Sequence, residues 1–128
     1  MGRVVLDSSV LIALYNRNDL HHGIVLTKFG SESNQYEISA IGLMETLVAP
    51  FADGPGTSDR VLTAIDGSIA VIHPVTERIA VAAAKIRAKT KMKVPDAIIS
   101  ATATLVGAQL WTLDRRLAKA HKGAVLIV

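Results

Sequence analysis

Short apolar runs alternate along the chain with longer segments in which apolar residues recur every three or four positions. The short runs predict buried strands, and the longer segments predict amphipathic helices. We expect strands at residues 4–6, 36–39, 69–72, 109–113 and 124–128. We expect helices at about residues 10–16, 20–29, 41–48, 58–65, 76–90, 95–106 and 115–120. This alternation indicates an α/β fold in which helices cover both faces of a central, mostly parallel sheet.

Capping and breaking residues set the expected ends of several helices. Asp19 is expected to cap the second helix, and Pro50 to end the third. The turn signal of residues 52–56 should separate the third helix from the fourth. Pro95 suits the first turn of the sixth helix, which should stop before Gly107.

Length and composition narrow the class of protein. A chain of 128 residues, half of them hydrophobic, predicts one globular domain spanning residues 1–128. The absence of cysteine excludes disulfides, thiol catalysis and iron–sulfur clusters, and agrees with a cytoplasmic location. The apolar runs are too short to span a membrane, and the first residues read directly into a strand, so no removed leader and no membrane association are expected.

Four acidic residues lie within or beside apolar runs, where an unpaired carboxylate is unfavourable. They are Asp7, Glu45, Asp96 and Asp114. Taken singly, Asp7 and Asp114 also suit helix N-caps, and Asp96 suits the first turn of a helix. Asp7 and Asp114 follow expected strands, Glu45 lies early in the helix after the second strand, and Asp96 opens a helix. All four can therefore reach one edge of a parallel sheet.

Oxygen ligands from several carboxylates are what Mg²⁺ prefers. A shared divalent cation would keep the four acids ionised together and could activate a water for phosphodiester cleavage. Ser9 and Thr112 lie close to these acids in the sequence and could support them, although capping and β-propensity also explain these two residues.

Positive charge is concentrated in the last part of the chain. Residues 1–80 carry five Lys or Arg against nine Asp or Glu, whereas residues 81–128 carry nine against two. Basic residues on both sides of Asp96 and Asp114 are candidate RNA-binding residues, namely Lys91, Lys93, Arg115 and Arg116. A solvated basic surface is the alternative interpretation.

These residues occur in segments that resemble the motifs of the PIN-domain family. The segments LDSSVLIAL, ISAIGLMETL, VPDAIISATA and LWTLDRRLAKA stand in the family's order over essentially the whole chain. The Ser-Ser after Asp7, the Thr after Glu45 and Leu117 depart from common family residues, but no acid is missing.

In size and build, the chain looks most like VapC-type toxins of toxin–antitoxin pairs. The resemblance implies a three-layer α/β/α sandwich and an endoribonuclease that depends on Mg²⁺ or Mn²⁺ and cleaves RNA by a metal-activated water. It also implies a homodimer that is inhibited by a VapB-like antitoxin. By position, it assigns Asp7, Glu45, Asp96 and Asp114 to catalysis and to the metal, with Ser9 and Thr112 supporting.

Other functions fit the sequence less well. A phosphoacceptor receiver domain needs paired acids after the first strand, and a haloacid-dehalogenase-type phosphatase needs Asp-x-Asp there; Asp7-Ser8-Ser9 provides neither. A non-catalytic PIN-like module that binds RNA or protein is the main alternative, and divalent-metal binding would distinguish it from the enzyme.

Overall fold

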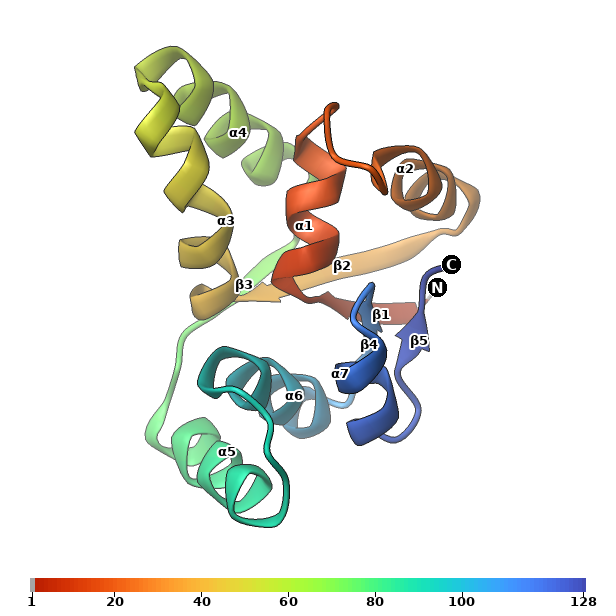
Figure 1. Cartoon of the computed structure of the whole chain (residues 1–128), viewed down its shortest axis with the longest axis vertical. Coiled ribbons are helices and arrows are strands. Elements are labelled where there is room, and N and C mark those ends of the chain that lie inside the picture. Colours follow the sequence, from red (N-terminus) through yellow and green to blue (C-terminus); the bar gives the residue numbers. More distant parts are fainter. Residues whose placement is uncertain (1) are drawn as a thin grey trace.

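The computed structural model describes residues 2–128, which form five strands and seven helices (Figure 1). The strands are β1 (Gly2–Leu6), β2 (Asn34–Ser39), β3 (Val71–His73), β4 (Gln109–Thr112) and β5 (Val125–Leu126). The helices are α1 (Ser8–Tyr15), α2 (His22–Ser31), α3 (Ala40–Asp53), α4 (Pro55–Ser68), α5 (Glu77–Lys89), α6 (Val94–Val106) and α7 (Arg115–Ala120).

The strands form a sheet with the order β3-β2-β1-β4-β5, and every pairing in it is parallel. Helices α1 to α4 cover one face and α5 to α7 the other, so the molecule has three layers (Figure 1). This confirms the α/β/α sandwich expected from the sequence. No helix within residues 2–128 is both long and apolar enough to cross a membrane.

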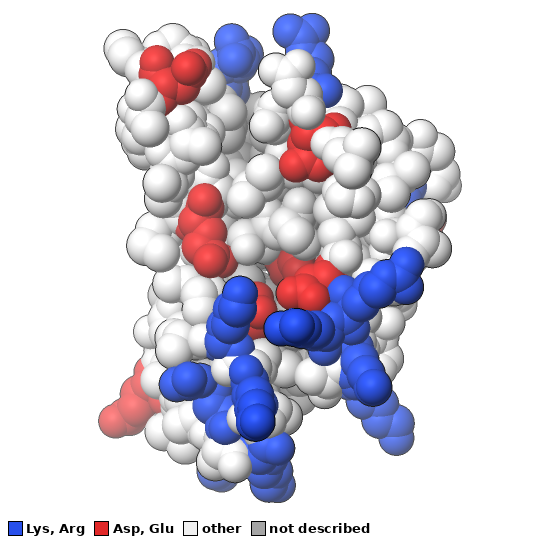
Figure 2. Space-filling view, in the orientation of Figure 1, with Lys and Arg blue, Asp and Glu red and all other residues white. Residues whose placement is uncertain are grey.

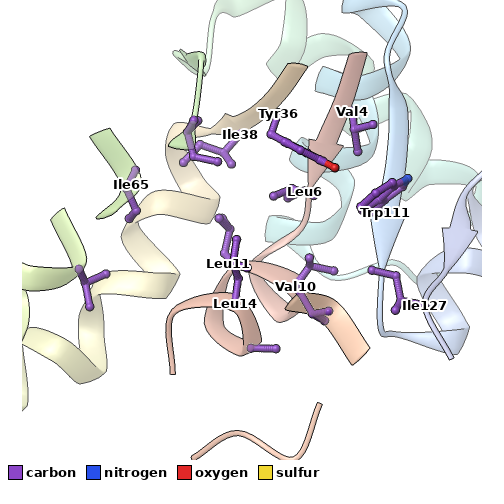
Figure 3. Close-up of a cluster of buried hydrophobic side chains, with 14 of the residues drawn as sticks. Val4, Leu6, Val10, Leu11, Leu14, Tyr36, Ile38, Ile65, Trp111 and Ile127 are labelled. Atoms are coloured by element: carbon purple, nitrogen blue, oxygen red, sulfur yellow. The ribbon is translucent and has the colours of Figure 1, made fainter. Parts of the chain in front are cut away.

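Two apolar clusters hold the layers together, one on each face of the sheet. On the α1 side, Leu6 and Trp111 of the central strands pack against Val10 and Leu14 of α1 (Figure 3). On the opposite side, Val5 belongs to a cluster with residues of α5 and α6. Successive residues of β1 therefore enter different clusters, as the two-residue period of a strand requires.

The third helix is longer than the sequence predicted. Pro50 lies inside α3, which continues to Asp53. Because only the last turn follows the proline, α3 loses a single backbone hydrogen bond there. The helix ends at Gly54, whose positive φ of 132° favours glycine. The fourth helix correspondingly begins at Pro55 rather than at residue 58.

Asp19 does not cap the second helix. Its Oδ1 accepts a hydrogen bond from the His21 backbone N–H at 2.8 Å, which closes a turn before the helix begins at His22. The third and fifth strands differ from the prediction only in extent, since β3 starts two residues late and β5 contains two residues.

A fifth acid, Glu37, is fully buried in β2, and it is not among the acids predicted from the sequence. Its carboxylate accepts hydrogen bonds from Arg3 at 2.7 and 2.8 Å and from Gln35 at 3.0 Å, and its Oε1 lies 2.6 Å from His73 Nε2. The Arg3 guanidinium is the main reason that the pKa of Glu37 falls to about 2. This network joins β1, β2 and β3.

Candidate active site

The sheet order changes direction between β1 and β4, because the chain adds β2 and β3 on one side and β4 and β5 on the other. Ligands of open α/β sheets bind beyond the carboxyl ends of strands at such a point. Asp7 follows β1 directly, and Asp114 follows β4 after one intervening residue. The fold therefore places these two acids on either side of the switch point.

Asp7 is nearly inaccessible to solvent, with 3% of its surface exposed. Its Oδ1 accepts hydrogen bonds from Ser9 Oγ at 2.6 Å and from the Val10 backbone N–H at 3.0 Å, so it also caps α1. Its Oδ2 accepts a hydrogen bond from Thr112 Oγ1. Burial nevertheless raises the pKa of Asp7, and the nearby Asp114 raises it further.

Ser9 and Thr112 connect Asp7 to the strand end that carries Asp114. Thr112 Oγ1, which donates to Asp7, accepts the Asp114 backbone N–H at 2.9 Å. Ser9 Oγ accepts the Leu113 backbone N–H at 3.2 Å. The two hydroxyls thus hold the ends of β1 and β4 in a fixed relation, and their supporting role at a metal site stays a prediction.

Helices α3 and α6 contribute Glu45 and Asp96. Burial raises the pKa of Asp96, and so do the charges of Asp114, Asp7 and Glu45, while Lys93 opposes the rise. Asp96 therefore lies close enough to each of the other three acids to feel its charge. We call Asp7, Glu45, Asp96 and Asp114 the acid cluster; their role as metal ligands stays a prediction.

The acid cluster has the chemistry of a site for a hard cation. Glu45 Oε1 is buried and has no hydrogen-bond partner within the described residues. Among the buried side-chain oxygen and nitrogen atoms of residues 2–128, it alone lacks one. No ion pair in this part of the chain involves any of the four carboxylates. Carboxylates that gather without ion-pair partners fit a divalent cation, although no three acidic or histidine side chains of residues 2–128 already stand at metal-binding spacing.

Basic residues line a hollow beside the acid cluster. This basic hollow has a volume of about 600 Å³, and its lining includes Lys91, Lys93, Asp96, Asp114, Arg115 and Arg116. Figure 2 shows acidic side chains in a depression near the centre of this face, with basic ones gathered below them over α5, α6 and α7. The structure thus brings all four candidate RNA-binding residues to the edge of the acid cluster.

A second hollow on the other side of Glu45 was not predicted. This distal pocket, of about 450 Å³, lies between α1, α3 and α4, and its lining includes Asn16, Arg17, Asn18, Glu45, Asp53 and Arg60. The polar segment Asn16-Arg17-Asn18 directly after an apolar helix was the available signal in the sequence. Arg60 had none, because only the packing of α4 beside α3 brings it there.

Comparison with known proteins agrees with this architecture. The PIN domain family matches residues 4–123. No curated protein matches the chain.

Among solved structures, a toxin–antitoxin complex from Klebsiella pneumoniae is 26% identical with a TM-score of 0.83, covering 98% of each chain. VapC20 of Mycobacterium tuberculosis, described as a toxin that cleaves the sarcin–ricin loop, is 19% identical with a TM-score of 0.78, covering 91% of this chain and 94% of that one. VapBC2 of Rickettsia felis, bound to a promoter DNA fragment, is 16% identical with a TM-score of 0.72, covering 97% and 96%.

The last two likenesses are likenesses of fold. The family match spans most of the chain and includes all four acids of the cluster. The protein belongs to the PIN domain family.

Proposed function

We propose that this protein is a metal-dependent endoribonuclease and the VapC-type toxin of a toxin–antitoxin pair. The observation that carries the proposal is the geometry of the acid cluster. Asp7 and Asp114 follow β1 and β4 at the switch point of the sheet, and the buried Oε1 of Glu45 has no hydrogen-bond partner within residues 2–128. Membership of the PIN domain family and the toxin–antitoxin relatives from Klebsiella pneumoniae and Mycobacterium tuberculosis support it.

The acid cluster is the proposed site for Mg²⁺ or Mn²⁺. Asp7, Glu45, Asp96 and Asp114 would hold the ion, and the unpartnered Oε1 of Glu45 supports this assignment. A divalent ion bound there would supply a Lewis acid that activates water and offsets charge on the phosphate. Because Mg²⁺ and Mn²⁺ both take carboxylate ligands, the residues favour neither of the two.

Other residues would prepare the site and hold the substrate. Ser9 and Thr112 donate hydrogen bonds to Asp7, which keeps its two oxygens oriented. Four basic residues line the same hollow as Asp96 and Asp114, and they would bind RNA phosphates there. They are Lys91, Lys93, Arg115 and Arg116. The basic hollow then holds the strand while the acid cluster performs the cleavage.

The proposed partners are RNA, a VapB-like antitoxin and a second copy of the chain, all in the cytoplasm. Helix α3 exposes Met44, Val48 and Phe51, which recur every three or four residues and so form one apolar stripe. An exposed stripe of this kind supports a protein interface.

Substituting Phe51 by Glu places a charge in this apolar stripe. The substitution should therefore shift the chain from dimer to monomer in analytical ultracentrifugation.

Cleavage of total cellular RNA by the purified protein tests the enzymatic proposal. We expect discrete fragments with Mg²⁺ or Mn²⁺, none with EDTA, and none from Asp96→Asn, which removes a charge with little change in shape. Arg78→Ala is a matched control, because Arg78 is exposed on α5 and lines neither the basic hollow nor the distal pocket.

The opposite result is equally informative. If the folded wild type, free of co-purified inhibitor, cuts no RNA with either metal, the enzymatic assignment is wrong. Binding of RNA or antitoxin without cleavage would then favour the non-catalytic module.

A further inference from the structure

The hollows around the acid cluster share lining residues and therefore follow one another along the surface depression that holds the acids. Asp114 lines both the basic hollow and a smaller hollow that also contains Ser9 and Ile12. Ile12 in turn lines the distal pocket, together with Glu45. A strand lying over the acids can therefore reach from Lys93 and Arg116 at one end to Arg17 and Arg60 at the other.

Charge distinguishes the two ends of this depression. Four basic and two acidic side chains line the basic hollow, an excess of two positive charges that suits phosphate. The distal pocket holds two arginines, Arg17 and Arg60, and two acids, Glu45 and Asp53, so its charges balance. A balanced pocket gives phosphate no net attraction, and its ligand should present both donors and acceptors.

The polar groups of the distal pocket are available for a ligand. Within residues 2–128, neither Arg17 nor Arg60 forms an ion pair or a side-chain hydrogen bond. Asn16 Oδ1 accepts the Asn18 backbone N–H at 3.0 Å, which fixes that side chain and leaves its amide N–H groups free to donate. One oxygen of Asp53 accepts a hydrogen bond from Thr57, and the other remains an acceptor.

We propose that the distal pocket is a base-recognition subsite that selects a guanine beside the cleaved bond. Guanine presents the acceptors O6 and N7 to an arginine and the donors N1–H and N2–H₂ to a carboxylate. Arg17 or Arg60 would take the first edge, and Asp53 the second. This inference rests on the proposed ribonuclease function, and it makes these residues determinants of specificity.

The lining favours RNA over an apolar partner segment. Amphipathic partner helices dock through apolar faces, whereas arginine, asparagine and aspartate side chains line much of the distal pocket. Sequence-specific recognition of single-stranded RNA depends on hydrogen bonds to base edges that have been turned out of a stack. The pocket is concave and adjoins Glu45, which belongs to the proposed cleavage site. The base that enters the pocket should therefore belong to a nucleotide next to the cleaved bond.

The test is a library of single-stranded RNA with randomised bases, cleaved by the wild type and sequenced. We expect guanine to be enriched at one fixed position relative to the cut. At least one of three variants should reduce the guanine enrichment about tenfold, which is the effect of one bidentate base contact. The variants are Arg17→Ala, Arg60→Ala and Asp53→Asn. Arg78→Ala should keep the wild-type preference.

A binding measurement separates this inference from the proposed function. The Asp96→Asn variant should bind a short RNA containing guanine more tightly than the same RNA with adenine in its place. In that background, Arg17→Ala or Arg60→Ala should reduce the difference. If the wild type cuts nothing but this preference in binding persists, the ribonuclease proposal fails and the subsite stands.

Three results would overturn the subsite. The first is cleavage without base preference at any fixed position. The second is a preference that all three distal-pocket variants leave unchanged. The third is loss of antitoxin binding in these variants with the cleavage pattern preserved, which would assign the pocket to the protein partner.

Discussion

At the scale of single residues, capping and membership of the acid cluster are compatible roles. Asp7 caps α1 and Asp114 caps α7, as the structural alternatives from the sequence proposed. Asp96 lies in the first turn of α6, as its alternative also proposed. A helix N-terminus favours a nearby carboxylate, so the same contacts that begin these helices also hold the charges beside one another.

The raised pKa of Asp96 predicts that its charge destabilises the metal-free protein. A carboxyl with a raised pKa in the folded state holds its proton more tightly there than in the unfolded chain. Folding is therefore weakened as pH rises from the ordinary value through the raised one. Asp96→Asn should raise the melting temperature in EDTA at neutral pH, as measured by calorimetry.

Added Mg²⁺ or Mn²⁺ should stabilise the wild type more than the Asp96→Asn variant. Two outcomes would contradict the idea that the acid cluster carries uncompensated charge. The variant could melt at a lower temperature than the wild type in EDTA, or the metals could stabilise both proteins equally.

Glu37 predicts the opposite pH dependence. Its pKa is lowered to about 2 from the ordinary 4.5, chiefly by the hydrogen bonds from Arg3 and also by His73 and Gln35. Its contribution to stability is therefore fully present above about pH 4.5 and is lost as pH falls through about 2. Glu37→Gln should be less stable than the wild type at pH 7, with a smaller difference at pH 3, as measured by urea unfolding.

The matched control for Glu37 is Glu77→Gln, which changes an exposed acid in the first turn of α5. It should leave the pH dependence of unfolding close to that of the wild type. A Glu37→Gln variant with the wild-type pH profile would show that the network on β1, β2 and β3 does not stabilise the fold.

At the scale of elements, the site depends on how strand ends are joined. Thr112 ends β4, donates a hydrogen bond to Asp7 and accepts the Asp114 backbone N–H. A single buried hydroxyl thus connects β1, β4 and the start of α7. Helix propensity alone cannot supply this contact, because its partners are 105 residues apart in the sequence.

Thr112→Val keeps the shape of the side chain and removes both hydrogen bonds. Because it leaves buried groups without partners, it should lower the free energy of unfolding by about 1–3 kcal/mol. Cleavage should fall as well, because one of the two hydroxyls that orient Asp7 is absent. Urea unfolding and the RNA cleavage rate check the two effects.

Thr104→Val is the control for Thr112→Val, since the hydroxyl of exposed Thr104 bonds within α6 to the Ser100 carbonyl. Its effect on stability should stay within about 0.5 kcal/mol, with cleavage unchanged. Equal effects of the two substitutions would argue against a special role for Thr112.

At the scale of the whole molecule, the charge asymmetry of the sequence becomes a spatial arrangement. The basic residues that follow residue 80 gather over α5 to α7 and border the acidic depression (Figure 2). Basic residues bind a polyanion and draw it to the surface, whereas the acids need a metal before they can approach phosphate.

Replacing Arg115 and Arg116 together with Ala should weaken RNA binding and flatten its salt dependence. For single-stranded RNA, the slope of log K against log salt should fall in magnitude by about 0.7 for each phosphate that the variant no longer neutralises. Fluorescence titration in the Asp96→Asn background measures it without cleavage. A slope equal to that of the Arg78→Ala control would exclude the two arginines as phosphate-binding residues.

Three features could be predicted from local sequence: the alternation of strands and helices, the length of α6 between Pro95 and Gly107, and the choice of the four acids. These features are local, because periodicity, capping and the unfavourable burial of charge are all visible within a few neighbouring residues. The acids could be selected from the sequence because each stands in or beside an apolar run, where a charge is conspicuous.

Which distant groups meet depends on the packing of the folded chain. Three features arise from packing between elements: the continuation of α3 past Pro50, the burial of Glu37 beside Arg3 and His73, and the position of Arg60 in a pocket that Glu45 also lines. Local sequence carries little information on such contacts, since they depend on strand order and on the choice of helix neighbours. The members of the acid cluster could therefore be selected from the sequence, whereas the distal pocket appeared only when the fold brought its walls together.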